Sequence, residues 1–401
     1  MPQASNHSNI LLSEILRTSE KHRLQPTLCD SRIDWSSFLQ ASGDRLLTPI
    51  IARKICTPEL SSFIPDDVVG ALQMIRDYNL TRNQRLIETF VRIASVLNQG
   101  NIRPLPLKGT SLLLYGIYPD QADRIVSDID ILIQPSEVKK ALQILKQHDF
   151  VQRSNPFLGD KGHWDDRFET IDIDDFRHKP SEQNYHLPPI KEHQDAEFYI
   201  EIHTRPCKGH GSMEMELTRL AANSTALDSK NGSLFRRPGL SFTLMHTAHH
   251  MLIQDRLMYL GLTDHRHLLD IHHLMGHIVD SGETAELQEM AESTHFNDLS
   301  TFALWQCQQT LDVAYQFDFK TSQTGKQWIV NFTAITKNNA LQRFRRAWSA
   351  INTTITKFFS IKALRHAFGD MPVTKSLPLY TRYQCQRAVH AVTLAVKRKR
   401  G

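Results

Sequence analysis

The chain has 401 residues, of which 40% are hydrophobic and 22% are charged, as in an ordinary globular protein. Its formal net charge of +4 is too small to indicate nucleic-acid binding by itself. Five scattered cysteines without a Cys-x-x-Cys pair indicate neither a disulfide framework nor a cysteine zinc site. The sequence has no signal-peptide pattern and no apolar run of about 18 residues, which predicts a cytoplasmic protein without a membrane span.

Residues 1–100 are expected to form an N-terminal helical region. Apolar side chains recur at intervals of three and four residues, and Asp34 or Ser31 is placed to cap one of the helices. The longest helical pattern covers residues 68–97, with a break predicted near Asn79. Such amphipathic segments predict a helical bundle with a shared apolar core.

Residues 101–205 are expected to form the catalytic module. The pattern predicts a short strand at 102–107, a helix after it, and a second strand at 128–133. A helix at 138–148 and a strand at 197–204 follow. This order of strands and helices predicts an α/β or α+β core.

The predicted strand at 128–133 has the sequence DIDILI and contains two carboxylates. Alternation along a strand places Asp128 and Asp130 on one face and the isoleucines on the other. Two like charges side by side are unfavourable without a cation, and Mg²⁺ is favoured because it prefers oxygen ligands. Taken alone, these six residues fit a plain edge strand with a solvated acidic face at least as well.

A glycine turn precedes the aspartate strand. Lys108, Gly109, Thr110 and Ser111 are followed by four apolar residues, a pattern that predicts the start of a helix. The free N–H groups and the positive dipole at a helix N-terminus suit a phosphate group. Lys108 adds a point charge to this turn, and Arg124 lies between the turn and the strand.

The segment 197–204 alternates strictly between apolar and polar residues, which predicts a strand. Its polar face contains Glu197, Glu201 and His203, and from the residues alone this face is either exposed surface or part of a site. A second Asp-x-Asp occurs at 172–174, but no glycine turn precedes it and charged residues crowd it. We therefore do not assign that motif to the site.

Residues 206–401 are predicted to be helical and contain many histidines. His246 and His250 lie four residues apart on a predicted helix, a spacing that can bind zinc, although a packed pair is favoured because the His-Glu-x-x-His signature is absent. Arg266 and Asp270 have the same spacing and are expected to pair on one helix face.

Two further features of this region are weaker signals. His267, His272, His273 and His277 are close in sequence, but a metal site among them is disfavoured because no strand or cysteine partner accompanies them. The basic tail at 397–400 is more typical of a solvated terminus than of a contact with nucleic acid or membrane.

Several of these motifs resemble the uncharacterised nucleotidyltransferase family, a branch of the polymerase-β-like nucleotidyltransferase superfamily. The residues that carry the resemblance are Lys108-Gly109, Tyr115, Arg124 and Asp128-x-Asp130. The resemblance covers residues 35–280 and implies an α+β fold: a small mixed-sheet nucleotidyltransferase core flanked by N-terminal and C-terminal helical regions. This chain departs from the superfamily in two ways. Thr110 or Ser111 must supply the hydroxyl after the glycine, and the gap from Gly109 to Asp128 is longer than in compact members.

The resemblance also implies a metal site. Asp128 and Asp130 would hold Mg²⁺ (or Mn²⁺), and Glu201 with His203 matches the acid-x-His that closes the catalytic core in this family. Glu201 is therefore expected to be the third carboxylate, although glutamate is longer than an aspartate at that position would be. Glu197 is the alternative, because it lies on the same face of the predicted strand.

Two more sets of residues follow from the resemblance. The expected nucleotide-binding residues are Lys108, Gly109, Thr110, Ser111 and Arg124. The residues expected to shape the substrate pocket are His203, His246, His250, Arg266 and Asp270.

The implied activity is transfer of a nucleoside monophosphate from a nucleoside triphosphate, such as ATP, to a hydroxyl group of a small molecule, a peptide or an RNA. One alternative is a non-catalytic nucleotide-binding or interaction module with the same fold. Another is an enzyme of this fold that modifies a nucleic acid or a protein partner, which only the basic tail favours.

Overall fold

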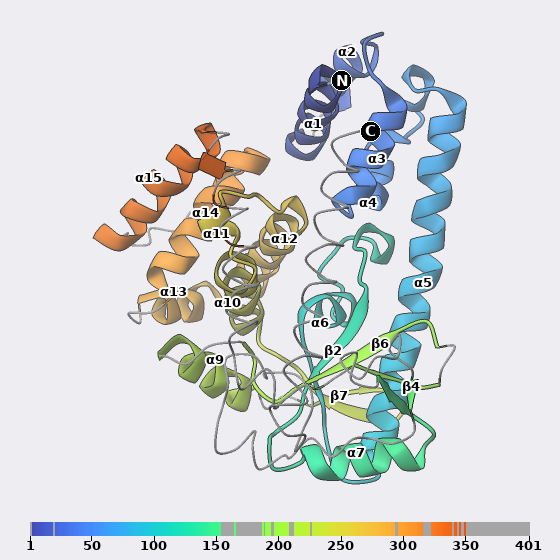
Figure 1. Ribbon diagram of the computed structural model, residues 1–401, viewed down its shortest axis with the longest axis vertical. Helices are drawn as coiled ribbons and strands as arrows, with labels where there is room; N and C mark the ends of the chain where they lie inside the picture. Colours follow the sequence, from blue (N-terminus) through green and yellow to red (C-terminus); the bar gives the residue numbers. More distant parts are fainter. Residues whose placement is uncertain are drawn as a thin grey trace, which may run out of the picture.

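The computed structural model is an α+β fold in which helices surround one small mixed sheet (Figure 1). This confirms the fold class expected from the sequence. The structure describes residues 2–18, 21–153, 164–165, 187, 189–193, 196–207, 212–224, 227–292, 296–315, 322–338, 341–342, 345 and 349. The Asp-x-Asp at 172–174 and the basic tail at 397–400 lie outside these residues.

The N-terminal region is helical, as expected. Its helices are α1 (Pro2–Arg17), α2 (Lys21–Leu28), α3 (Trp35–Asp44), α4 (Thr48–Ile55), the short η1 (Ser61–Phe63) and α5 (Asp66–Asn98). Asp34 caps α3, because its carboxylate accepts hydrogen bonds from the Ser37 backbone N–H at 3.1 Å and from the Ser37 hydroxyl at 2.6 Å. Of the two caps that the sequence offered, Asp34 is the one used.

Helix α5 is continuous through Asn79, so the predicted break was wrong. Asn79 and Asn83 are buried, and their amides donate to backbone carbonyls of the loop before the aspartate strand. The Asn79 amide lies 2.7 Å from the Ala122 carbonyl oxygen, and the Asn83 amide lies 2.8 Å from that of Arg124. Buried backbone carbonyls require hydrogen-bond donors, and the two asparagines supply them to this loop. The apolar pattern of α5 is interrupted at Asn79 for this reason.

Among the described residues, six short strands form one sheet in the order β1-β2-β6-β5-β3-β4. The strands are β1 (Leu105–Pro106), β2 (Asp128–Leu132), β3 (Val151–Arg153), β4 (Trp164–Asp165), β5 (Ile190–Lys191) and β6 (Tyr199–His203). The neighbours β2 and β6 are parallel, and the other pairs are antiparallel. Between strands lie α6 (Lys108–Leu114), η2 (Gln121–Asp123) and α7 (Val138–Gln147).

In its described part, the chain after β6 is mainly helical, with one β-hairpin. Its elements are α9 (Ser212–Asn223), β7 (Leu227–Lys230), β8 (Ser233–Arg236), α10 (Leu240–His249), the π-helix η4 (His250–Gln254), α11 (Leu257–Leu260), α12 (His265–Ser281), α13 (Thr284–Glu292), α14 (Asn297–Leu311) and α15 (Gln323–Lys337). Helices α13, α14 and α15 agree with the prediction that this region is helical.

The buried apolar residues in the described part of the chain form two clusters, and α5 contributes to both. Its first half places Val68 and Leu72 in a helical core, and its second half places Leu86 and Phe90 in a core on the sheet. Figure 1 shows α5 running from the N-terminal helices at the top to the sheet at the bottom. The helical core also contains residues of α10, α12 and α14, so the two ends of the described chain share one core.

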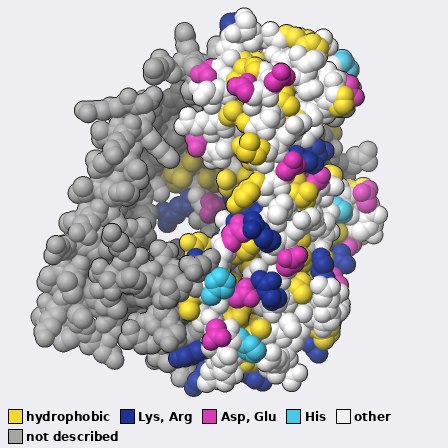
Figure 2. Space-filling model, turned by 90° about the vertical axis from the view of Figure 1, so that its right-hand side faces the viewer, with side chains coloured by type: hydrophobic (Ala, Val, Ile, Leu, Met, Phe, Trp, Pro, Cys, Tyr) yellow, Lys and Arg dark blue, Asp and Glu magenta, His cyan; other side chains and the backbone are white. Residues whose placement is uncertain are grey.

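The side of the molecule on which α5 lies has interleaved acidic and basic side chains (Figure 2). Arginines of α5 pair with carboxylates of other segments: Arg76 with Asp120, Arg82 and Arg85 with Glu197, and Arg92 with Glu192. No described helix combines the length and the hydropathy needed to cross a bilayer.

Candidate active site

The carboxylates predicted from the two strand motifs lie side by side on β2 and β6. The parallel register pairs Asp130 with Glu201 and Leu132 with His203. The intervening isoleucines, including Ile129 and Ile131, are buried in the sheet core, which fixes the acidic residues on the opposite face. One ligand atom each from Asp130, Glu201 and His203 lies within 4.8 Å of the others. We call Asp128, Asp130, Glu201 and His203 the carboxylate site.

Asp130 is the buried centre of this site. Its Oδ1 accepts a hydrogen bond from Lys108 Nζ at 2.8 Å and lies 2.7 Å from His203 Nε2. Burial alone would raise the pKa of Asp130, but the charge of Lys108 and the hydrogen bond with His203 hold that pKa well below its ordinary value. Asp130 is therefore an anion at neutral pH.

Asp128 stands at the start of β2 and is half-buried. Its Oδ1 accepts a hydrogen bond from the Ser127 hydroxyl at 2.7 Å. Burial raises the pKa of Asp128, and the negative charge of Asp130 raises it further, while Lys108 and Arg266 oppose this. The neighbouring carboxylates thus repel each other, and a bound cation would relieve that repulsion.

Gly109 is required by close packing at the start of α6. A Cβ at this position would lie 2.8 Å and 2.9 Å from the two γ-methyl groups of Val126, the residue that leads into β2. Neither atom belongs to a long flexible side chain, so the glycine allows α6 to approach the aspartate strand. Lys108, the residue before Gly109, has a left-handed backbone conformation with a φ of 50°, which is uncommon for a residue other than glycine.

The two hydroxyls that follow the glycine are buried. Thr110 is 0% exposed and Ser111 is 2% exposed. The Thr110 hydroxyl accepts from the Asp130 backbone N–H at 3.3 Å and donates to the Asp128 backbone carbonyl at 3.4 Å. Thr110 therefore holds the backbone between the two aspartates in place.

Arg124 is buried in an ion pair with Asp270 of α12. Its Nε and second terminal nitrogen donate to the two carboxylate oxygens of Asp270 at 2.7 Å and 2.9 Å, and the Tyr118 hydroxyl donates to the same carboxylate at 2.5 Å. The sequence prediction that Asp270 pairs with Arg266 was wrong, because the carboxylate faces the loop before β2. Arg266 instead lies near Asp264, with 4.0 Å between a guanidinium nitrogen and Oδ2.

His246 of α10 and His250 of η4 do not form the zinc pair considered from their spacing. His246 is buried, its ring stacks on Phe242, and its Nε2 lies 2.6 Å from the Pro206 carbonyl oxygen. The Nδ1 of His250 lies 3.2 Å from Asp255, and the two histidine rings are 6.5 Å apart between centroids. The favoured interpretation was a packed or hydrogen-bonded pair: His246 is packed against Phe242, whereas His250 lies beside Asp255.

The histidines of α12 also separate. The Nδ1 of His272 lies 3.1 Å from the Tyr315 hydroxyl, and the Nε2 of His277 lies 3.1 Å from the Ile117 carbonyl oxygen. Sequence reasoning missed three residues that the structure brings to this area: Tyr118, Asp255 and Asp264. Each belongs to a loop or a helix end, where no periodic pattern indicates which partner a side chain contacts.

Helices α10 and α12 lie close to the carboxylate site. The charge of Lys108 contributes to the lowered pKa values of His246 and His250, after burial, which is the main cause for both. Arg266 of α12 contributes to the pKa of Asp128. The site is therefore built from the sheet, the start of α6 and the two C-terminal helices together.

A comparison with known protein families matches residues 31–312 to the family described as uncharacterised nucleotidyltransferase. The chain belongs to this family. The match includes β2, β6 and α12, so it covers the whole carboxylate site and its helical neighbours. Searches of curated proteins and of solved structures found no significant match.

Proposed function

We propose that the protein is a metal-dependent nucleotidyltransferase that moves a nucleoside monophosphate from a nucleoside triphosphate to an acceptor hydroxyl. The observation that carries this proposal is the parallel register of β2 and β6, which sets Glu201 directly beside Asp130. Glu197, the alternative third carboxylate, is held by Arg82 and Arg85 of α5 at 3.3 Å and 3.2 Å. The pairing of Glu197 supports Glu201 as the third acid.

The donor set of the carboxylate site fits Mg²⁺ or Mn²⁺. Asp128, Asp130 and Glu201 offer hard oxygen ligands on one sheet face, and the raised pKa of Asp128 reflects a repulsion that a divalent cation relieves. When bound, the ion neutralises charge on the triphosphate and lowers the pKa of the acceptor hydroxyl.

The residues that contact the phosphates are assigned from the exposure of the cationic side chains. Lys108 is 21% exposed at its side chain and reaches Asp130, so it is placed to contact a phosphate oxygen beside the aspartates. Arg266 is 22% exposed and adds a second cation near Asp128. We assign phosphate contact to these two residues, with Gly109, Thr110 and Ser111 shaping the turn and Arg124 anchoring the loop.

The proposed step is an in-line displacement. The acceptor oxygen forms a bond to the α-phosphorus, the bond from that phosphorus to the bridging oxygen breaks, and pyrophosphate leaves with the electron pair. The hydroxyl proton passes to solvent. The protein contributes positioning and charge stabilisation rather than a covalent intermediate.

In this proposal each of the three regions expected from the sequence contributes residues to the site or to its support. Residues 101–205 supply the carboxylates, residues 206–401 supply α12 with Arg266 and Asp270, and residues 1–100 supply α5, which anchors the loop before β2. We propose a nucleoside triphosphate and a hydroxyl-bearing small molecule, peptide or RNA as the substrates.

The test is an incubation of the purified full chain with α-phosphate-labelled nucleoside triphosphates, Mg²⁺ and separate pools of sugars, peptides and RNA. Label transferred to one pool, with release of pyrophosphate, supports the proposal and names the acceptor class. Transfer should be lost in Glu201→Gln and kept in Glu197→Gln, which is the matched control on the approach to the same strand. Metal-dependent triphosphate binding without transfer to any pool would instead support a non-catalytic nucleotide-binding module.

A further inference from the structure

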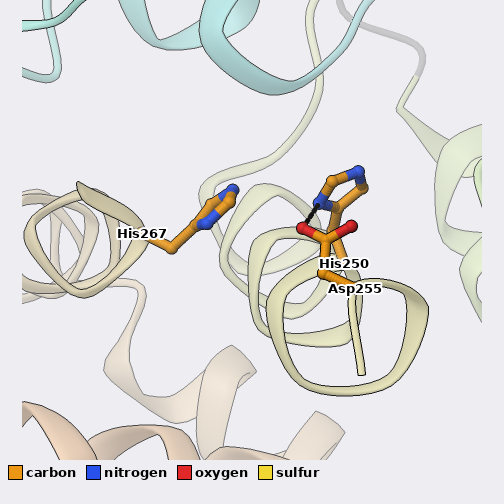
Figure 3. A group of neighbouring side chains, drawn as sticks. All are labelled: His250, Asp255 and His267. Atoms are coloured by element: carbon orange, nitrogen blue, oxygen red, sulfur yellow. Dashed lines mark ion pairs between the residues drawn. The ribbon is translucent and has the colours of Figure 1, made fainter. Parts of the chain in front are cut away.

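A second group of metal-ligating side chains lies between η4 and α12. One ligand atom each from His250, Asp255 and His267 lies within 4.8 Å of the other two. Figure 3 shows His250, at the start of η4, beside Asp255, which directly follows η4, with His267 of α12 pointing toward them. We call these residues the His-Asp-His cluster.

The spacing within the cluster suits direct ligation. A tetrahedral ion with bonds of about 2.0–2.1 Å holds its ligand atoms about 3.3 Å apart. His250 Nδ1 and Asp255 Oδ2 are 3.2 Å apart, yet this buried Nδ1 makes no hydrogen bond of good geometry with any described residue. Two atoms at this distance with poor hydrogen-bond alignment are placed as two ligands of one ion would be.

His267 has the supporting contact that metal-binding histidines usually have. Its Nδ1 lies 2.9 Å from Asp264 Oδ2, a contact that fixes the tautomer and directs the lone pair to Nε2. Asp264 is itself fixed, because it caps α12 and accepts from the Arg266 backbone N–H at 2.9 Å. Asp264 therefore orients His267 within the cluster.

The backbone around Asp255 is also unusual. Helix α10 continues into the π-helix η4, and Arg256 then adopts a left-handed conformation with a φ of 57°. π-Turns inside helices occur frequently at functional sites, because the wider turn displaces side chains from the regular spacing. Here the wider turn lets His250 and Asp255 face each other across five residues.

Exposure gives an ion access to this cluster. The side chain of Asp255 is 39% exposed, that of His250 is 17% exposed, and that of His267 is 9% exposed. The carboxylate thus lies at the surface while the imidazoles lie beneath it, and solvent reaches the cluster from the Asp255 side.

We propose that His250, Asp255 and His267 bind a divalent transition-metal ion, with zinc as the preferred ion. Two imidazoles and one carboxylate favour zinc over Mg²⁺, which prefers oxygen ligands alone. Three protein ligands leave a fourth position for water or another ligand. The ion would join the end of η4 to the first turn of α12, the helix that carries Arg266 and Asp270. This site shares no residue with the carboxylate site.

The test is a titration of the chelator-treated full chain with Co²⁺, a coloured substitute for zinc, in excess Mg²⁺, followed by displacement with Zn²⁺. The wild type should bind one Co²⁺ with visible bands of a tetrahedral ion and release it to Zn²⁺. Asp130→Asn should bind equally well, because its change lies in the carboxylate site. Asp255→Asn, at a partly exposed position, should weaken binding at least 100-fold, and Asp264→Asn should weaken it about 10–100-fold.

His272→Gln is the matched control, because it removes a histidine of α12 that pairs with Tyr315 outside the cluster. It should leave the Co²⁺ spectrum and affinity unchanged. The proposal fails if the wild type binds no Co²⁺ in excess Mg²⁺. It also fails if Asp255→Asn, with wild-type thermal unfolding, keeps the wild-type affinity, or if Asp130→Asn abolishes binding.

Discussion

The carboxylate site and the His-Asp-His cluster differ in how the chain assembles them. The carboxylate site stands on two neighbouring parallel strands, where alternation and register place Asp130 and Glu201 side by side. The His-Asp-His cluster stands on the ends of two helices, where a π-turn and a helix cap bring its members together. A strand pair fixes side chains through its own hydrogen bonds, whereas a site at helix ends depends on how the helices pack.

Helix α12 connects these two regions. Its first turns carry His267 of the cluster, Arg266 near Asp128, and Asp270, which holds Arg124 of the loop before β2. A change in α12 can therefore reach both sites, while a change within β2 is confined to one.

Asp130→Asn should lower the rate of nucleotidyl transfer by about 10³-fold or more, because it removes a metal-holding charge from the centre of the carboxylate site. Single-turnover rates with labelled triphosphate measure the effect, and Glu197→Gln should retain most of the activity. A variant Asp130→Asn that transfers label at the wild-type rate would remove Asp130 from the catalytic machinery. The Co²⁺ affinity of the His-Asp-His cluster should not change, which separates the two regions.

Asp270→Ala should lower the free energy of unfolding by about 3–5 kcal/mol, because it leaves the buried Arg124 guanidinium without its bidentate partner. Denaturant unfolding followed by circular dichroism measures this change. Tyr118→Phe, which removes only one hydrogen bond to the same carboxylate, should cost clearly less. Equal costs for the two variants would mean that the ion pair does not hold α12 to the loop.

His273 makes the helical region sensitive to pH. Burial, with a contribution from His272, lowers the pKa of His273 to about 4, whereas an unfolded histidine titrates near 6.5. Between these pH values the unfolded chain binds more protons, so the free energy of unfolding falls as the pH falls, by about 1–3 kcal/mol. Asp130, with its lowered pKa, contributes stability that is lost only below about pH 4.

The measurement is denaturant unfolding at several pH values between 7 and about 4. His273→Gln should make the decline shallower than in the wild type, and His148→Gln, at an exposed position, should not. Identical slopes for the wild type and His273→Gln would show that His273 is not neutral in the folded protein in this range.

Asn83→Ala should lower the free energy of unfolding by about 1–2 kcal/mol, because the Gln121 carbonyl oxygen loses its amide donor and the Arg124 carbonyl oxygen keeps only the longer contact with the Asn79 amide, at 3.2 Å. It should also lower the transfer rate modestly, since this loop leads directly into β2. Thermal unfolding and the labelled-transfer assay measure the two effects. No change in either would mean that α5 does not position the aspartate strand.

The strand motifs were predicted correctly because their signal is local. DIDILI and EFYIEIHT each alternate, and alternation alone decides which side chains share a face. The family resemblance, which rests on these motifs and on Lys108-Gly109, is confirmed by the match over residues 31–312. The predicted metal-holding roles of Asp128, Asp130 and Glu201 stay predictions until the transfer assay is done.

The sequence predictions were wrong where a polar side chain binds a partner that is distant in the sequence. Asn79 interrupts the apolar pattern of α5 because its amide binds a loop more than forty positions away, a contact that no local pattern records. Asp270 has the spacing of a helix pair with Arg266 but binds Arg124 from another segment. In both cases a buried polar group took the partner that the tertiary structure supplied, since a lost hydrogen bond in the interior costs more than a surface ion pair gains.

The amino-acid sequence by itself determined the order of helices and strands and the face on which Asp128 and Asp130 lie. These features depend on backbone periodicity and on contacts between neighbours in the chain. Only the tertiary structure decided that Glu201 rather than Glu197 stands beside Asp130, that Thr110 faces the strand, and that His250, Asp255 and His267 meet. Those choices depend on strand register and helix packing, in which burial of apolar surface across the whole chain outweighs any local preference.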